Sequence, residues 1–368
     1  MRIEHMQILM ADGVFRTGSV EFEEKIQKIT LSDTVKPDVG PYLIPGLVDV
    51  HTHGALGGDH SHGCGEKLKE MAMFYAKNGT TSFLATTLTA AEEALAGAVS
   101  TVAQHQRPEK GARCVGINIE GPFFSYNKRG AHQAELLKVP DIVMFERLFK
   151  LSGERIKLLC VAPELPGAME FIKKVSQVSY VSLAHSTADY NTAMQAFDNG
   201  ATHVTHLFNG MNPFLHREPG IIGAAMDAGA FVEVISDGYH LHPSVIRAIF
   251  RMFPDRVCLI SDSLGCTGLP DGNYESAGLP ITVTEGKAVL RDGSSIAGST
   301  ISLLQGVRIA VSLGIPLAQA AFSASAHAAR AIGMEGSIGS IKPGAYADMV
   351  LLDSTLAIQK VYIGGKEV

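Results

Sequence analysis

The segment Leu43-Ile44-Pro45-Gly46-Leu47-Val48-Asp49-Val50 marks the point where the pattern of the chain changes. It is a nearly continuous apolar run, which is typical of a strand buried on both faces of a parallel sheet. Before it, the sequence predicts short strands at 1–9, 14–22 and 25–31. After it, short apolar runs alternate with amphipathic stretches of helical spacing. A β/α region therefore begins at this segment.

Eight apolar runs in this region predict strands. They are Leu47–Val50, Ser82–Thr86, Cys114–Glu120, Ile156–Ala162, Tyr180–His185, His203–His206, Phe231–Asp237 and Arg256–Asp262. Between them, helices are predicted at 66–78, 91–106, 141–152, 167–178 and 188–199. Eight strand–helix units over about 250 residues predict an α/β fold of the (β/α)8 TIM barrel type.

Both ends of the chain predict strands outside the barrel. Near the C-terminus, strands are predicted at Asp348–Asp353 and Gln359–Ile363. Chain termini often lie close together, so these strands could meet those of the first thirty residues in space. We therefore expect residues 1–46 and 335–368 to form a small β-sandwich domain, and residues 47–334 to form the barrel. A hairpin-like insert at 281–290, with a turn at Asp292-Gly293, follows the eighth strand; its packing within 281–300 stays open at this point.

Composition excludes several classes of protein. The 368 residues are 46% hydrophobic and 18% charged, which is ample for a large core. A net charge of −6 gives no electrostatic footprint for nucleic acid, and no apolar run approaches the length of a membrane span. The N-terminus lacks the layout of a signal peptide. Five scattered cysteines without a C-x-x-C favour reduced thiols, so we expect a cytoplasmic protein.

Polar side chains that bind metals or move protons stand at the ends of the predicted strands. Active sites of barrels form at this C-terminal face, and imidazole and carboxylate groups are the usual ligands of divalent metals. His51 and His53 form an H-x-H pair. Because side chains alternate between the two faces of a strand, both rings point the same way, about 6–7 Å apart along the strand. The residues in question are His51, His53, Glu120, His185, His206 and Asp262. Together they predict a metal site.

Other chemistries lack their motifs. The sequence has no G-x-x-x-x-G-K-[ST], no G-x-G-x-x-G after a strand and no G-x-S-x-G elbow. The glycines between Gly54 and Gly65 are better explained by tight turns of a loop over the site than by phosphate binding.

Several motifs in order along the chain resemble one family. Pro45–Gly54 is similar to the metal-binding signature of the amidohydrolase superfamily. The narrower matches resemble its N-acetylglucosamine-6-phosphate deacetylases. They are Ile119-Glu120-Gly121-Pro122-Phe123, Lys128-Arg129-Gly130-Ala131-His132, Thr205-His206-Leu207-Phe208-Asn209-Gly210-Met211, His216-Arg217-Glu218-Pro219-Gly220, Asp237-Gly238-Tyr239-His240-Leu241-His242-Pro243, Gly268–Gly272 and Ile296–Thr300.

This resemblance implies a metal-dependent barrel. Glu120, His185 and His206 look like the ligands of the main metal, and His51 and His53 look like those of a second metal that shares the glutamate. One or two divalent ions per subunit are expected, and zinc, iron, cobalt and manganese all suit the ligand set.

The resemblance also assigns roles around the metal. Asp262 looks like the catalytic aspartate, His240 like the residue that orients the acetamide carbonyl, and His132 like a contact to the sugar. Asn209 and the backbone of Gly210 resemble a phosphate grip. In a homodimer, Arg217 of the partner subunit would complete that grip.

The implied reaction is hydrolysis of N-acetylglucosamine 6-phosphate to glucosamine 6-phosphate and acetate, in amino-sugar catabolism. The same chemistry on the galactosamine isomer, or on another N-acylated sugar phosphate, stays open. A dihydroorotase-like enzyme typically carries a metal-bridging lysine at the fourth strand, where this chain has Leu159-Cys160-Val161-Ala162-Pro163. An inactive barrel is disfavoured because every ligand position is filled.

Overall fold

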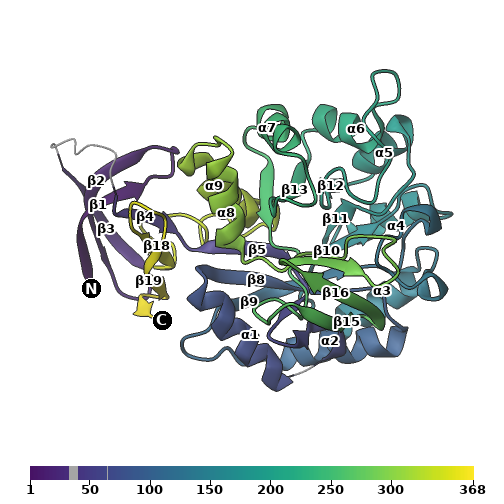
Figure 1. Cartoon of the computed structure of the whole chain (residues 1–368), viewed down its shortest axis with the longest axis horizontal. Coiled ribbons are helices and arrows are strands. Elements are labelled where there is room, and N and C mark those ends of the chain that lie inside the picture. The colour runs from purple at the N-terminus through teal and green to yellow at the C-terminus, as the bar shows by residue number, and fades with distance from the viewer. Residues whose placement is uncertain (33–39, 64) are drawn as a thin grey trace.

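The barrel is the larger part of the molecule (Figure 1). In this computed structural model, which describes residues 1–32, 40–63 and 65–368, neighbouring strands pair in parallel in the order β5-β8-β9-β10-β11-β12-β13-β14. The strands are β5 (Leu47–Thr52), β8 (Thr80–Thr87), β9 (Arg113–Glu120), β10 (Ile156–Val161), β11 (Tyr180–Leu183), β12 (Ala201–Val204), β13 (Phe231–Ile235) and β14 (Val257–Ile260). All eight predicted strands, and with them the predicted fold class, are confirmed.

Helices alternate with these strands and cover the outside of the barrel. The helices are α1 (Gly65–Lys77), α2 (Glu92–Gln104), α3 (Ile142–Leu151), α4 (Ala168–Val175), α5 (Tyr190–Asp198), α6 (Gly220–Ala228), α7 (Pro243–Met252), α8 (Leu303–Ser312), α9 (Leu317–Ser323) and α10 (Ala326–Ala331). Short 3-10 turns lie at His60–His62, Tyr126–Lys128 and Ala134–Leu136. The five helices predicted between residues 66 and 199 are present, with ends shifted by one to three residues.

The barrel closes between β14 and β5 just beyond the ends of the regular strands. The Asp262 amide donates a hydrogen bond to the His51 carbonyl at 2.9 Å, and the His53 amide donates to the Ser263 carbonyl at 2.8 Å. Inside, apolar side chains such as Val50 form one buried cluster. Closure therefore places the H-x-H segment beside Asp262, at the C-terminal mouth.

The two chain ends meet in a separate sheet, on the same side of the molecule (Figure 1). Its strands, in the order β20-β19-β18-β4-β1-β2-β3, are β20 (Lys366–Glu367), β19 (Ile358–Ile363), β18 (Met349–Leu352), β4 (Tyr42–Pro45), β1 (Arg2–Leu9), β2 (Phe15–Phe22) and β3 (Ile26–Leu31). Side chains from six of these strands share one buried cluster. The sheet thus has a core of its own, while the domain boundaries at 46 and 335 stay a prediction.

The insert after the eighth strand is a three-stranded sheet at the barrel mouth. It consists of β15 (Gly272–Ser276), β16 (Leu279–Thr284) and β17 (Lys287–Leu290). A separate two-stranded sheet of β6 (Gly54–Ala55) and β7 (Gly58–Asp59) follows the H-x-H pair in the sequence. The chain reverses between β16 and β17 at Glu285-Gly286, where both residues have positive φ. It reverses again at the predicted turn Asp292-Gly293, across which Val289 pairs antiparallel with Ile296. Its apolar face packs on Leu264 and Cys266.

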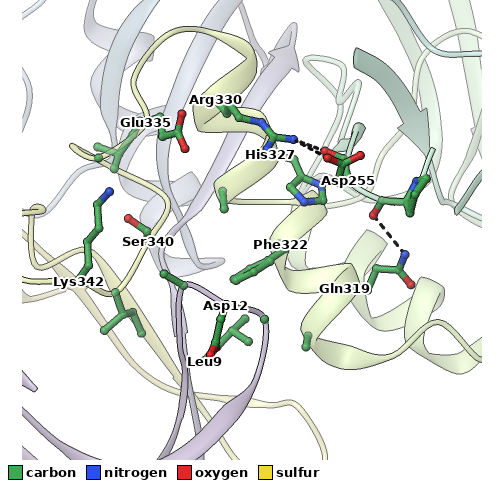
Figure 2. A pocket seen from close by; sticks show the side chains of 18 of the residues that line it. Leu9, Asp12, Asp255, Gln319, Phe322, His327, Arg330, Glu335, Ser340 and Lys342 are labelled. Atoms are coloured by element: carbon green, nitrogen blue, oxygen red, sulfur yellow. Dashed lines mark hydrogen bonds and ion pairs between the residues drawn. The ribbon is translucent and has the colours of Figure 1, made fainter. Parts of the chain in front are cut away.

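A cavity of about 530 Å³ lies where the small sheet meets the helices α9 and α10 (Figure 2). Leu9 and Asp12 come from the small sheet, Phe322 projects from α9, and the Arg330 guanidinium lies 3.8 Å from the Asp255 carboxylate. None of the predicted site residues lines it.

Among the described residues, no helix is long and apolar enough to cross a membrane.

Candidate metal centre

The predicted ligands stand at the C-terminal ends of five barrel strands. His51 lies in β5 and His53 follows it directly, and Glu120 is the last residue of β9. His185, His206 and Asp262 each come two residues after a strand, and all three have a positive φ, of 45°, 28° and 49°. Backbone strain of this kind persists at functional sites because the surrounding structure holds it. All of these side chains are buried.

Glu120 bridges two pairs of histidines. Its Oε1 lies 3.2 Å from His185 Nε2 and 3.1 Å from His206 Nε2. Its Oε2 lies 3.5 Å from His51 Nε2 and 3.2 Å from His53 Nε2. The carboxylate thus belongs to two groups that could each hold a metal ion. The sequence predicted both groups, and the structure brings them together around this glutamate.

The tautomers of these four histidines follow from their partners. The Nδ1 atoms of His53, His185 and His206 face the main-chain carbonyls of residues 86, 128 and 209 at 3.2, 2.8 and 3.2 Å. His51 Nδ1 faces the Glu233 carboxylate at 2.8 Å. These oxygens only accept hydrogen bonds, so each Nδ1 carries a proton, and each Nε2 is the nitrogen whose lone pair is offered to a cation that displaces any proton held there.

The spacing of the lone pairs fits a metal ion. His51 Nε2 and His53 Nε2 lie 3.3 Å apart, and His185 Nε2 and His206 Nε2 lie 3.1 Å apart. Two ligand atoms at about 2.1 Å from a tetrahedral zinc ion are separated by about 3.4 Å. Two unprotonated nitrogens repel each other at this distance, whereas a cation between them is bound by both. The donor set therefore fits a divalent metal.

The electrostatic field of the site also favours positive charge. Burial lowers the pKa of His53, but the carboxylates of Asp262 and Glu120 outweigh it and raise the pKa to about 9. For His51, Glu120, Glu233 and Asp262 likewise overcome burial and raise the pKa well above its ordinary value. The same contacts, acting against burial, hold the pKa of Glu120 well below its usual range and lower that of Asp262. Both carboxyl groups are therefore ionised at neutral pH.

His132 differs from the four histidines of the candidate metal groups, His51, His53, His185 and His206, which are called the metal-facing histidines below. Its Nδ1 accepts a hydrogen bond from the Thr89 amide at 3.4 Å, so its proton is on Nε2, which lies 3.8 Å from Glu120 Oε2. Burial, together with nearby His185, lowers the pKa of His132 to about 3. The ring is therefore an uncharged donor at the wall of the site, and this tautomer suits a substrate contact better than a metal bond.

His240 faces the same space and is held by Asp237. Its Nδ1 lies 2.7 Å from Asp237 Oδ2, and the Asp237 Oδ1 accepts the main-chain amides of Tyr239 and His240. Burial raises the pKa of Asp237, but the hydrogen bond from His240 outweighs it and lowers the pKa. The Asp237 carboxylate accepts the Nδ1–H and fixes the ring, so Nε2 is the nitrogen that remains for a contact in the cavity.

These groups surround a cavity of about 250 Å³. The insert forms part of its wall through Ser276 and the segment 295–298. The predicted site residues that line it are His53, Glu120, His132, His185, His206, Asn209, Gly210, His240 and Asp262. Arg217 does not line it: this side chain is exposed, and its Nη1 contacts His216 Nε2 at 2.6 Å. Within one chain, the structure therefore brings together every predicted site residue except Arg217.

The fold and this ligand arrangement agree with a family match. A model of the amidohydrolase family matches residues 42–368. This chain belongs to the amidohydrolase family. Among curated relatives, the N-acetylgalactosamine-6-phosphate deacetylase of Escherichia coli O157:H7 is 35% identical over 99% of this chain and 95% of its own length. The N-acetylglucosamine-6-phosphate deacetylase of Vibrio furnissii is also 35% identical, over 89% and 83%.

Solved structures give the same result for this amidohydrolase. The crystal structure of N-acetyl-D-glucosamine-6-phosphate deacetylase from Mycobacterium smegmatis superposes with a TM-score of 0.92 at 32% identity, over 100% of both chains. A mutant of that enzyme in complex with N-acetyl-D-glucosamine-6-phosphate superposes with a TM-score of 0.93 at 31% identity, over 100% of this chain and 98% of the other. The predicted family is therefore confirmed.

Sequence reasoning missed two carboxylates of the amidohydrolase site. Asp237 lies in the motif Asp237–Pro243, and its contact with His240, which it orients, does not follow from the motif alone. Glu233 was overlooked inside the strand Phe231-Val232-Glu233-Val234-Ile235. A single acidic residue within such an apolar run was the available signal, because a buried carboxylate requires a partner.

Proposed function

We propose that this amidohydrolase removes the acetyl group of N-acetyl-D-glucosamine 6-phosphate, giving D-glucosamine 6-phosphate and acetate. The observation that carries the proposal is the Glu120-bridged histidine cluster, open to a cavity whose other walls present His132, His240 and Asn209. Curated relatives of this name match most of the chain at more than 30% identity. N-acetylgalactosamine 6-phosphate is a second candidate substrate, because the Escherichia coli O157:H7 relative bears that name.

We propose two divalent ions per chain, with zinc, iron, cobalt and manganese as candidates. Glu120, His185 and His206 would hold one ion, and His51, His53 and Glu120 would hold the other. When bound, such an ion polarises an amide carbonyl and lowers the pKa of water toward about 7.

Asp262 is the proposed proton carrier. Its Oδ1 lies 3.0 Å from His53 Nε2 at the mouth of the barrel, and its lowered pKa keeps it ionised. As a general base it takes a proton from the water whose oxygen attacks the carbonyl carbon. When the C–N bond breaks, it returns that proton to the amine nitrogen. The acetic acid formed gives its remaining proton to the amine, so the products are acetate and the protonated amino sugar, and atoms and charge balance.

Two histidines position the substrate in this proposal. His240, held by Asp237, would in its doubly protonated form donate its Nε2–H to the carbonyl oxygen as negative charge develops there. His132 donates its Nε2–H to an oxygen of the sugar. Both rings line the same cavity as Asp262, so one N-acetylated sugar contacts all three residues.

Asn209 and the backbone of Gly210 would grip the phosphate, together with Arg217 of the partner subunit in a homodimer. Asn209 and Gly210 line the cavity, whereas Arg217 is exposed on a loop whose Phe214 and Leu215 are 43% and 46% exposed. Exposed apolar residues beside an arginine are typical of a subunit contact. We place the homodimer in the cytoplasm, a proposal supported by the free thiols of the four described cysteines.

An acetate-release assay tests the function. The purified protein is supplied with N-acetylglucosamine 6-phosphate, its galactosamine isomer, and each sugar without phosphate, and metal content is measured in the same sample. We expect the highest kcat/KM on the glucosamine 6-phosphate derivative. A higher kcat/KM on the galactosamine isomer would select the second candidate, and no acetate from either phosphate by metal-loaded protein would reject both.

A further inference from the structure

Glu233 is a carboxylate inside the barrel, one layer below the metal centre. Its neighbours on the same face of β13, Phe231 and Ile235, belong to the apolar interior cluster, and Ile235 also lines the site cavity. In the sheet, Glu233 pairs with Cys258 of β14, which is fully buried. Glu233 itself has no exposed surface. An ionised carboxylate at such a position is costly unless it is compensated.

Among the described residues, the only side chain that forms a hydrogen bond with the Glu233 carboxylate is that of His51, one of the four histidines of the candidate metal groups. Glu233 Oε2 accepts the Nδ1–H of His51 at 2.8 Å, and no described group donates to Oε1. His51 is also without exposed surface. The bond fixes the ring so that Nε2 points at Glu120 and His53. Glu233 is therefore built to act through His51.

His51 is distinguished from the other three histidines by this partner. His53, His185 and His206 donate to neutral main-chain carbonyls, whereas His51 donates to a carboxylate. A carboxylate partner makes an imidazole a stronger ligand and adds a negative charge close to the ion. The extra charge acts through His51, on the His51–His53 side of Glu120, because His51 is the ring that the Glu233 carboxylate contacts.

The charge of the centre shows why this matters for a second ion. With four neutral imidazoles, the three carboxylates that contact the His51 ring, Glu120, Asp262 and Glu233, give three negative charges, so one divalent cation leaves a net negative charge among them that still attracts a second. Without Glu233, only two of these charges remain and the first cation offsets both, so the attraction for a second ion is weaker. We propose that Glu233 is the positioning residue that enables the His51–His53 side to hold a second divalent ion.

This inference rests on the proposed metal centre, and metal binding tests it without substrate. Full-length wild type and the Glu233→Gln variant are equilibrated with buffered free Zn²⁺, and bound zinc is measured by elemental analysis. Gln keeps the size and an acceptor for His51 but removes the charge. We expect wild type to saturate at two ions, and the variant to keep the first and to need about 10–100-fold more free Zn²⁺ for the second. Retention of the first ion shows that the barrel is folded.

Two further variants separate charge from shape. Glu233→Asp keeps the charge and should bind the second ion more tightly than Glu233→Gln. Glu164→Gln is the matched control: this carboxylate accepts from Ser186 and Thr187 beside the site but touches no metal-facing histidine, so zinc binding should be unchanged.

Three results would overturn the inference. They are a Gln variant that binds the second ion within about threefold of wild type, equal losses in the Gln and Asp variants, and a wild type that saturates at one ion. None of these rejects the deacetylase proposal, which the acetate-release assay tests separately.

Discussion

Replacement of Asp262 by asparagine tests the proton carrier directly. The amide has the same size, and its oxygen can keep the place of Oδ1, 3.0 Å from His53 Nε2 and 3.5 Å from His51 Nε2. The histidine–Glu120 groups do not include Asp262, so the metal ligands stay intact. What disappears is the basic oxygen. The variant therefore isolates proton transfer from binding.

The expected loss follows from that isolation. General acid–base catalysis by a positioned group contributes about 10²–10⁴-fold, which is about 3–5 kcal/mol in the activation free energy. Because Asp262 is almost fully buried and is the only carboxylate other than Glu120 lining the cavity in the described structure, no other described carboxylate replaces it. We expect kcat for Asp262→Asn to fall at least about 100-fold, with a small change in KM.

The assay measures acetate release at saturating substrate and metal content in the same preparation. Asp189→Asn is the control, because it removes the same charge from an exposed helix cap far along the chain and should leave kcat unchanged. A metal-replete Asp262→Asn enzyme that turns over within about threefold of wild type would remove Asp262 from the mechanism. Loss of metal together with activity would reassign it as a ligand.

Three other perturbations extend the test. Changing both His51 and His53 to Ala should lower the metal content by about one ion per chain in elemental analysis, and an unchanged content would refute the second metal position. Arg217→Ala should raise KM for the phosphorylated sugar by roughly 30- to 700-fold, the equivalent of about 2–4 kcal/mol, with a smaller effect on the unphosphorylated sugar; equal losses on both would show that it does not bind phosphate. Burial lowers the pKa of His203 to about 4, so the unfolded chain takes up its proton first and stability falls as pH drops from about 6.5 toward 4. Urea unfolding at several pH values measures this fall in the free energy of unfolding, which is on the order of 3 kcal/mol. His203→Gln should make the fall smaller, whereas exposed His216→Gln should leave it unchanged.

The order of the strands and the positions of the candidate ligands could be predicted because both follow from local patterns in the sequence. Apolar runs such as Leu47–Val50 and Phe231–Ile235 are long enough to define buried strands, and the alternation of strands and helices leaves few topologies. In a parallel barrel, all strands end at one face. Polar residues that terminate different strands therefore converge, whatever their separation along the chain.

The turns of the insert were only partly predictable. The turn predicted at Asp292-Gly293 is present, but the chain also reverses earlier, at Glu285-Gly286, which splits the predicted segment 281–290 into two paired strands. Pairing of β16 with β17 places Ile281 and Val283 in one buried cluster with Leu264, so burial of apolar side chains on the barrel mouth helps to select the register.

Local patterns in the sequence were enough to predict the barrel, and they also predicted which residues are candidate ligands and on which face they gather. The packing of distant segments sets which oxygen of Glu120 faces which pair of histidines, which partner each ring nitrogen has, and the place of Arg217 outside the cavity of its own chain. These properties depend on contacts such as that between His51 and Glu233, which are 182 residues apart. Local propensity carries no information about such pairs, because their distance is fixed only when the barrel closes and its interior packs.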